Sequence, residues 1–177
     1  MDEITIERLV IEEKEIIIDE LMDLYGQEIL QLSYSYVKNR ELAEDLTQDI
    51  FVKCYQSLHT YKGKSKIRTW LWRIAINHCK DYLKSWYKNH VVPSSDEYIY
   101  SGDSGHSTEQ AVIRQDEEER LAHSVMRLPI KYREVIYLHY FEEMPIREMA
   151  QVLSINNNTV KTRLRRAKAL LKESWEG

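Results

Sequence analysis

Residues that break helices are scarce in this sequence. Its 177 residues include only 5 glycines and 3 prolines. Such a chain favours long helices over a turn-rich sandwich or a glycine-looped nucleotide fold. Hydrophobic residues make up 43% of the sequence, which is enough apolar material for a folded core. We therefore predict an all-α fold.

Three of the eight glycines and prolines lie in one polar stretch. From Asn89 to about Thr108 the sequence has no apolar periodicity, and Pro93, Gly102 and Gly105 fall within it. A composition of this kind is typical of a linker. The spacing of apolar residues predicts helices on both sides, over these segments: Asp19–Val37, Glu41–Ser57, Ile67–Lys88, Glu109–Leu128 and Tyr132–Phe141. The prediction is two small helical domains joined by a flexible linker.

The net charge of −4 hides an alternation of charge along the chain. Residues 1–20 hold eight acids and two bases, a local net of −6, and residues 93–120 hold the same numbers. Residues 62–88 hold eight bases and one acid, a net of +7, and residues 159–172 hold six bases and no acid. Two basic patches suit a polyanionic partner such as nucleic acid. The alternative is that each charge run is a solvated helix face.

The helix predicted over residues 67–88 combines aromatic and basic residues. Its expected apolar stripe comprises Leu71, Ile74, Ala75, His78 and Tyr82. Because successive residues point in different directions, we expect at least one of Trp70 and Trp72 to be buried against the helix over residues 19–37. Tyr61, whose loop also carries three lysines, is the better candidate for stacking on an unstacked base.

The C-terminal segment has the pattern of a helix-turn-helix. Pro145 stands where the first residue of a short helix is expected, and a tight break follows at residues 154–156. Ser154 occupies a turn position where glycine is common, which predicts slight strain in the turn. The side chains of residues 157–159 are expected to cap the second helix.

The second helix of this pair is expected to present a basic face. Val160, Leu164, Ala167 and Leu171 would point inward. The side chains that would point outward are Lys161, Thr162, Arg165, Arg166 and Lys168. Arginine and lysine reach guanine edges or phosphate oxygens, so such a helix suits the major groove of DNA. The alternative is a packed helical hairpin whose outer face is merely soluble.

Several classes of protein have no support in the sequence. No run of about 18 apolar residues is present, and the acidic start Met1-Asp2-Glu3-Ile4 does not resemble a secretory signal. Cys54 and Cys79 are therefore interpreted as reduced cysteines of a cytosolic protein. His78 and Cys79 lack the companion spacing of a zinc site, and no phosphate-binding or nucleophile-elbow motif occurs. We expect no metal, no cofactor and no catalytic residues.

An enzyme such as a nuclease is a further alternative. It would use the carboxylates of Glu44, Asp45 and Asp49. Acids near the start of a helix are equally explained by their favourable interaction with the helix dipole. No set of metal ligands converges with them, so this alternative is disfavoured.

Three motifs in the first half resemble region 2 of bacterial sigma factors of the extracytoplasmic-function (ECF) type. They cover residues 41–51, 61–65 and 69–77, from Glu41-Leu42-Ala43-Glu44-Asp45 to Ala75-Ile76-Asn77. Leu128-Pro129 and residues 146–168 resemble region 4 of the same family. The resemblance spans roughly residues 24–172. It implies a promoter-specificity subunit of RNA polymerase that lacks regions 1.1 and 3 of primary sigma factors.

The resemblance also implies a division of the chain. Residues 1–19 would form an acidic N-terminal extension, residues 20–88 sigma region 2, residues 89–115 the linker and residues 116–177 sigma region 4. The acidic linker would run through the polymerase toward its RNA exit path.

Three binding surfaces follow from the resemblance. Asp45, Gln48 and Asp49 match the helix that docks on the clamp coiled coil of the largest polymerase subunit. An unstacked base of the minus-10 element would be captured by the glycine-containing loop and the next helix, through Tyr61, Lys62, Ser65, Lys66, Ile74 and Asn77. The residues that would read or flank the minus-35 element are Lys161, Thr162, Arg165, Arg166, Lys168 and His139.

The expected partners are core RNA polymerase, through its clamp and flap, and promoter DNA that is double-stranded at minus-35 and single-stranded at minus-10. Members of the family are usually held inactive by an anti-sigma factor, often a membrane-bound one. No small-molecule substrate is expected, and the protein would be cytoplasmic, joining the nucleoid within the holoenzyme. A stand-alone helix-turn-helix regulator is the alternative. It explains the basic C-terminal helix but not the acidic helix joined to the cationic loop.

Overall fold

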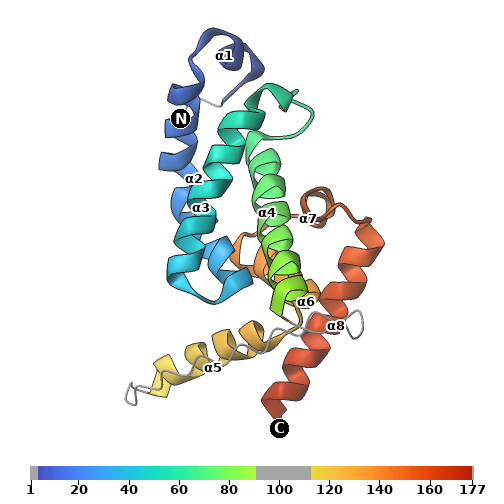
Figure 1. Cartoon of the computed structure of the whole chain (residues 1–177). Helices are drawn as coiled ribbons and strands as arrows, with labels where there is room; N and C mark the ends of the chain where they lie inside the picture. The colour runs from blue at the N-terminus through green and yellow to red at the C-terminus, as the bar shows by residue number, and fades with distance from the viewer. Residues whose placement is uncertain (1–3, 91–112, 177) are drawn as a thin grey trace. The chain divides into compact units, whose positions relative to one another are not determined.

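The computed structural model describes residues 4–90 and 113–176. Within these ranges the chain is helical and contains no β-strand, which confirms the all-α prediction. It divides into two compact units, one of residues 1–93 and 151–154 and the other of residues 94–150 and 155–177. Helices α1–α4 are called the N-terminal unit here, and helices α5–α8 the C-terminal unit (Figure 1). Most of the predicted linker, residues 91–112, lies outside the described residues.

The N-terminal unit is built on three mutually packed helices, α2 (Lys14–Val37), α3 (Arg40–Ser57) and α4 (Ile67–His90). A short helix α1 (Ile6–Ile11) precedes them, and a single 3₁₀ turn η1 (Leu58–Thr60) follows α3. The predicted helices are present, with α2 starting at Lys14 rather than at Asp19. The fully buried core residues of α2 are Ile17, Leu21, Ile29, Leu32 and Tyr36.

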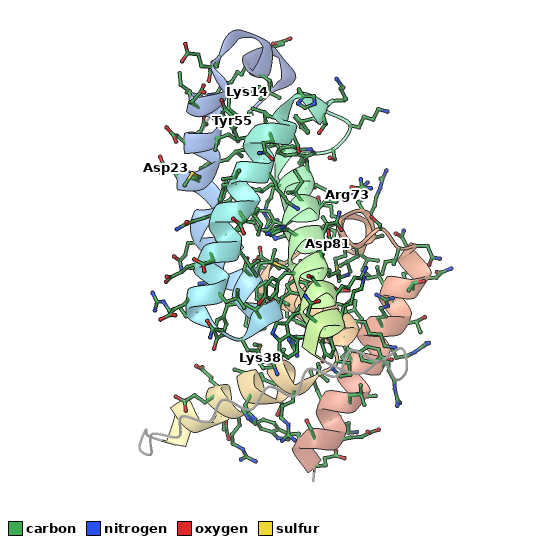
Figure 2. All side chains as sticks on the ribbon, viewed as in Figure 1. Lys14, Asp23, Lys38, Tyr55, Arg73 and Asp81 are labelled. Atoms are coloured by element: carbon green, nitrogen blue, oxygen red, sulfur yellow. The ribbon has the colours of Figure 1, made fainter. Side chains whose placement is uncertain are left out.

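The link between α2 and α3 is short and well capped. Lys38 ends α2 in the left-handed conformation, with φ of 55°. Asn39 then accepts a hydrogen bond from the Leu42 amide at 2.9 Å and so satisfies one of the free donors at the start of α3. At the other end of the two helices the ammonium of Lys14 lies 5.6 Å from the ring centroid of Tyr55 (Figure 2). These contacts fix α2 and α3 against each other at both ends.

The buried face of α4 differs from the predicted stripe. Leu71 and Ala75 are buried as expected, but Ile74, His78 and Tyr82 are only half-buried. The rest of the buried apolar face consists of Trp72, Ile76, Cys79 and Leu83, with Ile67 at its start. The physical reason is that α4 packs against both α2 and α3, so its buried arc is wider than one stripe and is centred on different residues.

One tryptophan of α4 is buried as predicted. Trp72 has no exposed surface, and its ring meets the ring of Tyr25 of α2 edge-on at 5.4 Å. The guanidinium of Arg68 lies 4.5 Å from the centroid of the Trp72 ring. Trp70 remains half-buried, 5.8 Å from the ring of Tyr61.

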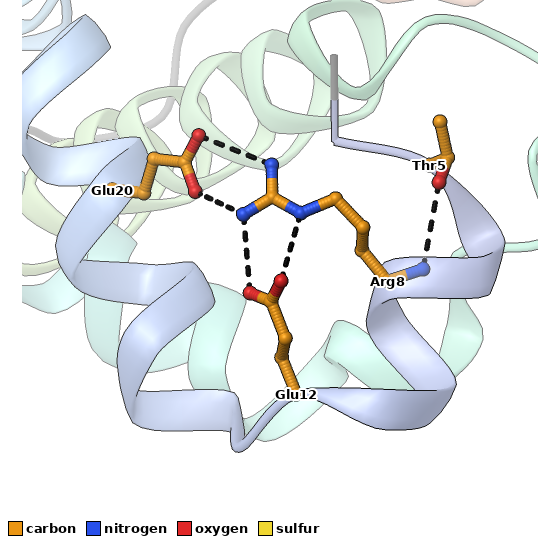
Figure 3. A network of polar contacts seen from close by, with 4 residues as sticks. All are labelled: Thr5, Arg8, Glu12 and Glu20. Atoms are coloured by element: carbon orange, nitrogen blue, oxygen red, sulfur yellow. Dashed lines mark hydrogen bonds and ion pairs between the residues drawn. The ribbon is translucent and has the colours of Figure 1, made fainter. Parts of the chain in front are cut away.

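The acidic N-terminal segment is anchored to the N-terminal unit. Arg8 of α1 places its guanidinium between the carboxylates of Glu12 and Glu20, at 3.0 Å and 2.7 Å (Figure 3). Thr5 caps α1 by accepting a hydrogen bond from the Arg8 amide at 3.4 Å. The Arg8 guanidinium holds the pKa of Glu12 below its ordinary value. Part of the segment predicted as an extension therefore belongs to α1 and to the first turns of α2.

The C-terminal unit contains α5 (Ile113–Arg127), α6 (Ile130–Ile136), a π-helical turn η2 (Tyr137–Phe141), α7 (Ile146–Leu153) and α8 (Asn157–Glu176). Helix α6 contacts α5 and α8, and α5 also contacts α8. The buried apolar residues of this unit include Val125, Leu128, Val135, Ile136, Leu138, Val160, Leu164 and Ala167. The single helix predicted over Tyr132–Phe141 is thus divided into an α-helix and a π-helical turn.

Two charged residues of α6 are buried and paired within the C-terminal unit. Arg133 donates to the backbone carbonyl of Leu128 at 2.9 Å. Glu134 is 3% exposed and lies 3.6 Å from the guanidinium of Arg163 on α8. Since a buried charge is costly unless it is paired, the contact between Glu134 and Arg163 helps to fix the position of α8 on α6.

Candidate nucleic-acid interface

The turn between α7 and α8 is tight and carries a strained residue. Ser154 has φ of 55°, a left-handed conformation that glycine adopts more readily than serine. The amide of Ile155 donates to the carbonyl of Ala150 at 3.1 Å and closes the end of α7. The predicted strain at Ser154 is confirmed by this backbone angle.

The helix ends of this pair differ from the prediction by one residue each. The cap of α8 is Asn156, whose Oδ1 accepts from the amide and the hydroxyl of Thr159 at 2.8 Å and 2.9 Å. Thr159 is therefore the donor to the cap rather than a cap itself. Pro145 lies just outside α7, and its carbonyl accepts from the Met149 amide at 2.9 Å. The prediction that residues 157–159 cap α8 is therefore wrong, because the cap is Asn156, the last residue of the predicted break.

The outer face of α8 carries the predicted basic side chains. Lys161, Thr162, Arg165, Arg166 and Lys168 are all exposed. Arg163, the remaining base of this stretch before Lys172, is partly buried and paired with Glu134. The cations on the outer face are therefore positioned toward solvent, while Arg163 stabilises the packing of the helix.

His139 lies beside the basic face of α8. It lines an open groove of about 350 Å³ together with Ile146, Lys161, Leu164, Arg165 and Lys168. Its lining combines two apolar side chains with three cationic ones, and the cations suit a phosphate-bearing ligand. The structure thus brings His139 together with three of the residues predicted to lie at the minus-35 element.

Two exposed aromatic residues at this end escaped the sequence prediction. Tyr140 is 52% exposed and Phe141 is 62% exposed. The ammonium of Lys168 lies 5.6 Å from the ring centroid of Tyr140, and that ring meets the imidazole of His139 edge-on at 4.9 Å. The π-helical turn η2 presents them, and a residue pattern gives no clear signal for such a turn.

The loop between η1 and α4 is held by a local hydrogen bond. The hydroxyl of Tyr61 donates to the backbone carbonyl of Ser65 at 2.6 Å, which closes the loop on itself. Gly63 at its centre has φ of 71°, a conformation that favours glycine. The ammonium of Lys62 reaches the carbonyl of His59 at 3.2 Å, while Lys66 is exposed.

The two α4 residues predicted for the same site share one face of the helix. Ile74 and Asn77 are three positions apart and therefore neighbours on the helix surface. Asn77 is exposed and Ile74 is half-buried. Arg73, which was not among the predicted site residues, is also exposed beside them. The sequence contained a signal for Arg73: it lies four positions before Asn77, so the arginine and the amide share one face of the helix.

An acidic and polar face lies on α3. Asp45, Gln48 and Asp49 are spaced by three and four residues, and all three are exposed. Val52 continues this face and is 54% exposed, so the surface ends in an apolar side chain. Behind it, Nε2 of His78 lies 3.6 Å from Oδ2 of Asp49. Sequence reasoning missed both Val52 and His78, because helical spacing placed His78 in the apolar stripe.

In the described residues no cluster of three His, Cys, Asp or Glu side chains could hold a metal ion. No helix in residues 4–90 or 113–176 is long and apolar enough to cross a membrane. Cys54 and Cys79 are buried free thiols, and burial raises the pKa of each to about 12.

Comparison with known families gives two matches that fall on the two units. Residues 21–87 match sigma-70 region 2, and residues 118–171 match sigma-70 region 4. Both matches come in the order and at the positions that the sequence motifs predict. They define the class of the protein as a two-domain initiation factor of the sigma-70 type.

Individual relatives narrow the class. The ECF RNA polymerase sigma factor SigW of Bacillus subtilis is 30% identical over 161 residues, which cover 87% of this chain and 86% of SigW. The ECF sigma factor SigM of the same organism is 33% identical over 156 residues, covering 88% of this chain and 93% of SigM. The chain belongs to the ECF RNA polymerase sigma factors. It directs core RNA polymerase to promoters, and the stand-alone regulator is not favoured.

Solved structures share the fold. CnrH, solved with the cytosolic domain of CnrY, has a TM-score of 0.66 at 23% identity, over 92% of this chain and 89% of that one. The sigma factor RpoE of Bartonella quintana, solved with the anti-sigma factor NepR, has a TM-score of 0.66 at 21% identity, over 89% of this chain and 96% of RpoE.

Proposed function

We propose that this sigma factor acts through three separate surfaces, each with its own partner. The observation that carries the proposal is the separation of charge: α3 exposes an acidic face, while the loop over residues 61–66 and the outer face of α8 expose basic residues. Sigma factors are non-enzymatic initiation factors, and this chain would confer specificity on the polymerase without a catalytic activity of its own.

The acidic face of α3 would bind the clamp of the polymerase. Asp45, Gln48 and Asp49 offer two carboxylates and an amide to basic side chains, and Val52 adds an exposed apolar contact at the end of the face. Interfaces commonly combine an apolar contact with polar groups that fix the orientation of the partner.

The minus-10 element would be captured by the 61–66 loop and the start of α4. The loop combines an aromatic ring with exposed lysines, which suits a base that has left the duplex and the phosphates beside it. The proposed contacts are Tyr61, Lys62, Ser65, Lys66, Ile74 and Asn77. A base held in this way is prevented from pairing again, so its capture favours promoter melting.

The minus-35 element would be read in the major groove by α8. Lys161, Thr162, Arg165 and Arg166 lie along the exposed face near the capped start of the helix. Lys168 and His139 line the same groove on the protein surface, and both would contact the phosphate backbone of the DNA. Helix N-termini also orient free backbone amides toward phosphates.

Control by an anti-sigma factor is part of the proposal. Of the two similar structures described above, CnrH is bound to the cytosolic domain of CnrY, and the sigma factor RpoE is bound to the anti-sigma factor NepR. For this chain we propose such a partner, membrane-bound or soluble. The protein would reside in the cytoplasm and join the nucleoid within the holoenzyme, and residues 89–115 would link region 2 (residues 20–88) to region 4 (residues 116–177).

In vitro transcription with core RNA polymerase tests the proposal. The full chain should bind core polymerase stoichiometrically and yield transcripts from its own promoters, whereas the chain without polymerase should bind promoter DNA weakly. Charge reversal at Asp45 (Asp45→Lys) should remove polymerase binding, and the matched reversal Asp23→Lys, at an exposed aspartate of α2 outside the proposed face, serves as the control. Tight, specific promoter binding by the chain alone would contradict the proposal.

A further inference from the structure

His78 of α4 forms a partly buried contact behind the acidic face of α3. Its Nε2 lies 3.6 Å from Oδ2 of Asp49, and the side chains are 16% and 64% exposed. Neither ring nitrogen of His78 has a hydrogen-bond partner among the described residues. A histidine that only fills space in a core usually directs a nitrogen to a carbonyl or hydroxyl. Here a carboxylate of the proposed polymerase-binding face lies 3.6 Å from the imidazole.

The charges around His78 come from both helices that surround it. Asp49 and Lys53 lie on α3, and Asp81 lies on α4 itself. Burial and the ammonium of Lys53 lower the pKa of His78 below its ordinary value, while Asp49 and Asp81 act in the opposite direction. The imidazole is therefore neutral at neutral pH and gains its proton only below its ordinary range.

We propose that His78 is a positioning residue that governs how available Asp49 is to the polymerase. When the imidazole is neutral, the Asp49 carboxylate has no charged partner in α4 and can pair with a basic side chain of the clamp. When the imidazole is protonated, it forms an internal ion pair with Asp49 that competes with the polymerase. The inference rests on the proposed role of the α3 face.

The sign of the effect follows from linkage. A basic polymerase side chain placed at Asp49 disfavours a second positive charge on His78, so binding would release the proton of His78. Acidification through the lowered pKa of His78 must then weaken the complex. Because Asp49 is largely exposed, the effect should be modest, about fivefold in affinity at most.

The affinity of the full chain for core polymerase, measured between about pH 7.5 and about pH 5.5, tests this inference. We expect the wild type to lose up to about fivefold more affinity than His78→Gln over this range. In an Asp49→Asn background the substitution His78→Gln should no longer change the pH profile. His123→Gln, an exposed histidine on α5, should behave as the wild type. Superposed profiles of wild type and His78→Gln would overturn the inference.

A second measurement leaves His78 unchanged and substitutes only the exposed Asp49. NMR titration of the His78 imidazole in the full chain should show a lower pKa in Asp49→Asn than in the wild type, because a neighbouring carboxylate that raises the pKa has been removed. An unchanged titration would overturn the inference. Full affinity of Asp49→Asn at about pH 7.5 would instead contradict the proposed polymerase face, whereas reduced affinity there with identical pH profiles would overturn only the role of His78.

Discussion

The loop over residues 61–66 and helix α8 are both basic and exposed, but they are built differently. Helix α8 is regular and begins at a side-chain cap, with Asn156 bonded to Thr159. The loop is irregular and closes through one hydrogen bond, from Tyr61 to Ser65. A regular helix fixes the spacing of its side chains and suits the repeating geometry of a duplex. A loop that combines a ring with cations suits a single base outside the stack.

The largest expected effect concerns the framework beneath the loop. Trp72→Ala removes a fully buried ring, and we expect a loss of about 3–5 kcal/mol in the free energy of unfolding, measured by urea denaturation. Trp70→Ala, at a half-buried position on the same helix, should lose clearly less. Equal losses would show that the two tryptophans are not divided between core and surface.

The second prediction separates base reading from phosphate contact on α8. Arg165→Ala or Arg166→Ala should cost about 1–3 kcal/mol of discrimination between a matched and an altered minus-35 element, if the side chain reads a base. If the side chain contacts only phosphate, the slope of affinity against salt should flatten instead. Holoenzyme binding to promoter fragments measures both. Lys172→Ala, an exposed base at the end of α8, is the control. A variant that alters neither quantity would remove that arginine from the interface.

The third prediction concerns the start of α8. Asn156→Ala removes the cap and should lower the free energy of unfolding by about 1 kcal/mol. Asn157→Ala, at the adjacent first position of the helix, should have little effect. Thermal unfolding by circular dichroism compares the two variants, and a larger loss for Asn157→Ala would contradict the assignment of the cap.

The fourth prediction concerns the closure of the loop. Tyr61→Phe keeps the ring but removes the hydroxyl that bonds to Ser65, a contribution of about 0.5–1.5 kcal/mol. We expect a several-fold weaker capture of a single-stranded minus-10 oligonucleotide by the holoenzyme. Tyr34→Phe, at an exposed tyrosine of α2, should leave capture unchanged. Unaltered capture by Tyr61→Phe would mean that a closed loop is not required.

The smallest effect is expected at the N-terminal arm, which carries none of the proposed DNA contacts. Because the pKa of Glu12 is lowered in the folded chain, its contribution to stability is present at neutral pH and is lost as the pH falls through the lowered value. The protection factors of the α1 amides, which correct for the intrinsic pH dependence of hydrogen exchange, should therefore fall in acid, and Arg8→Gln should remove this dependence. Protection factors of the α1 amides that change neither with acid nor with Arg8→Gln would contradict the anchoring role of Arg8.

The sequence predicted the helices well because apolar spacing and scarce glycine and proline are local signals. It was less informative where two helices share the burial of a third. The buried face of α4 is centred on Trp72, Ile76 and Cys79, since α2 and α3 both cover it. The face that a helix buries between two neighbours depends on their positions, which the spacing of residues within that helix does not encode.

In the candidate site, too, features set by local spacing were predictable and features set by packing were not. Exposure of Lys161, Arg165 and Arg166 on α8 was predictable from helical spacing and the absence of acids. The hydrogen bond between Tyr61 and Ser65 and the contact of His78 with Asp49 were not, because each depends on how the backbone folds back or on packing between helices. Val52 was missed for another reason: an apolar residue on a helix is expected to be buried.

The central claim is that the loop opens the promoter while α8 holds it. Paired DNase I and permanganate footprinting of holoenzyme on a promoter fragment tests it most directly, because the first detects protection at minus-35 and the second detects unpaired thymines at minus-10. We predict that Lys62→Ala and Asn77→Ala retain protection at minus-35 but lose reactive thymines at minus-10, whereas Arg166→Ala loses both unless high polymerase concentration restores binding. Unchanged melting by the Lys62 and Asn77 variants would contradict the claim.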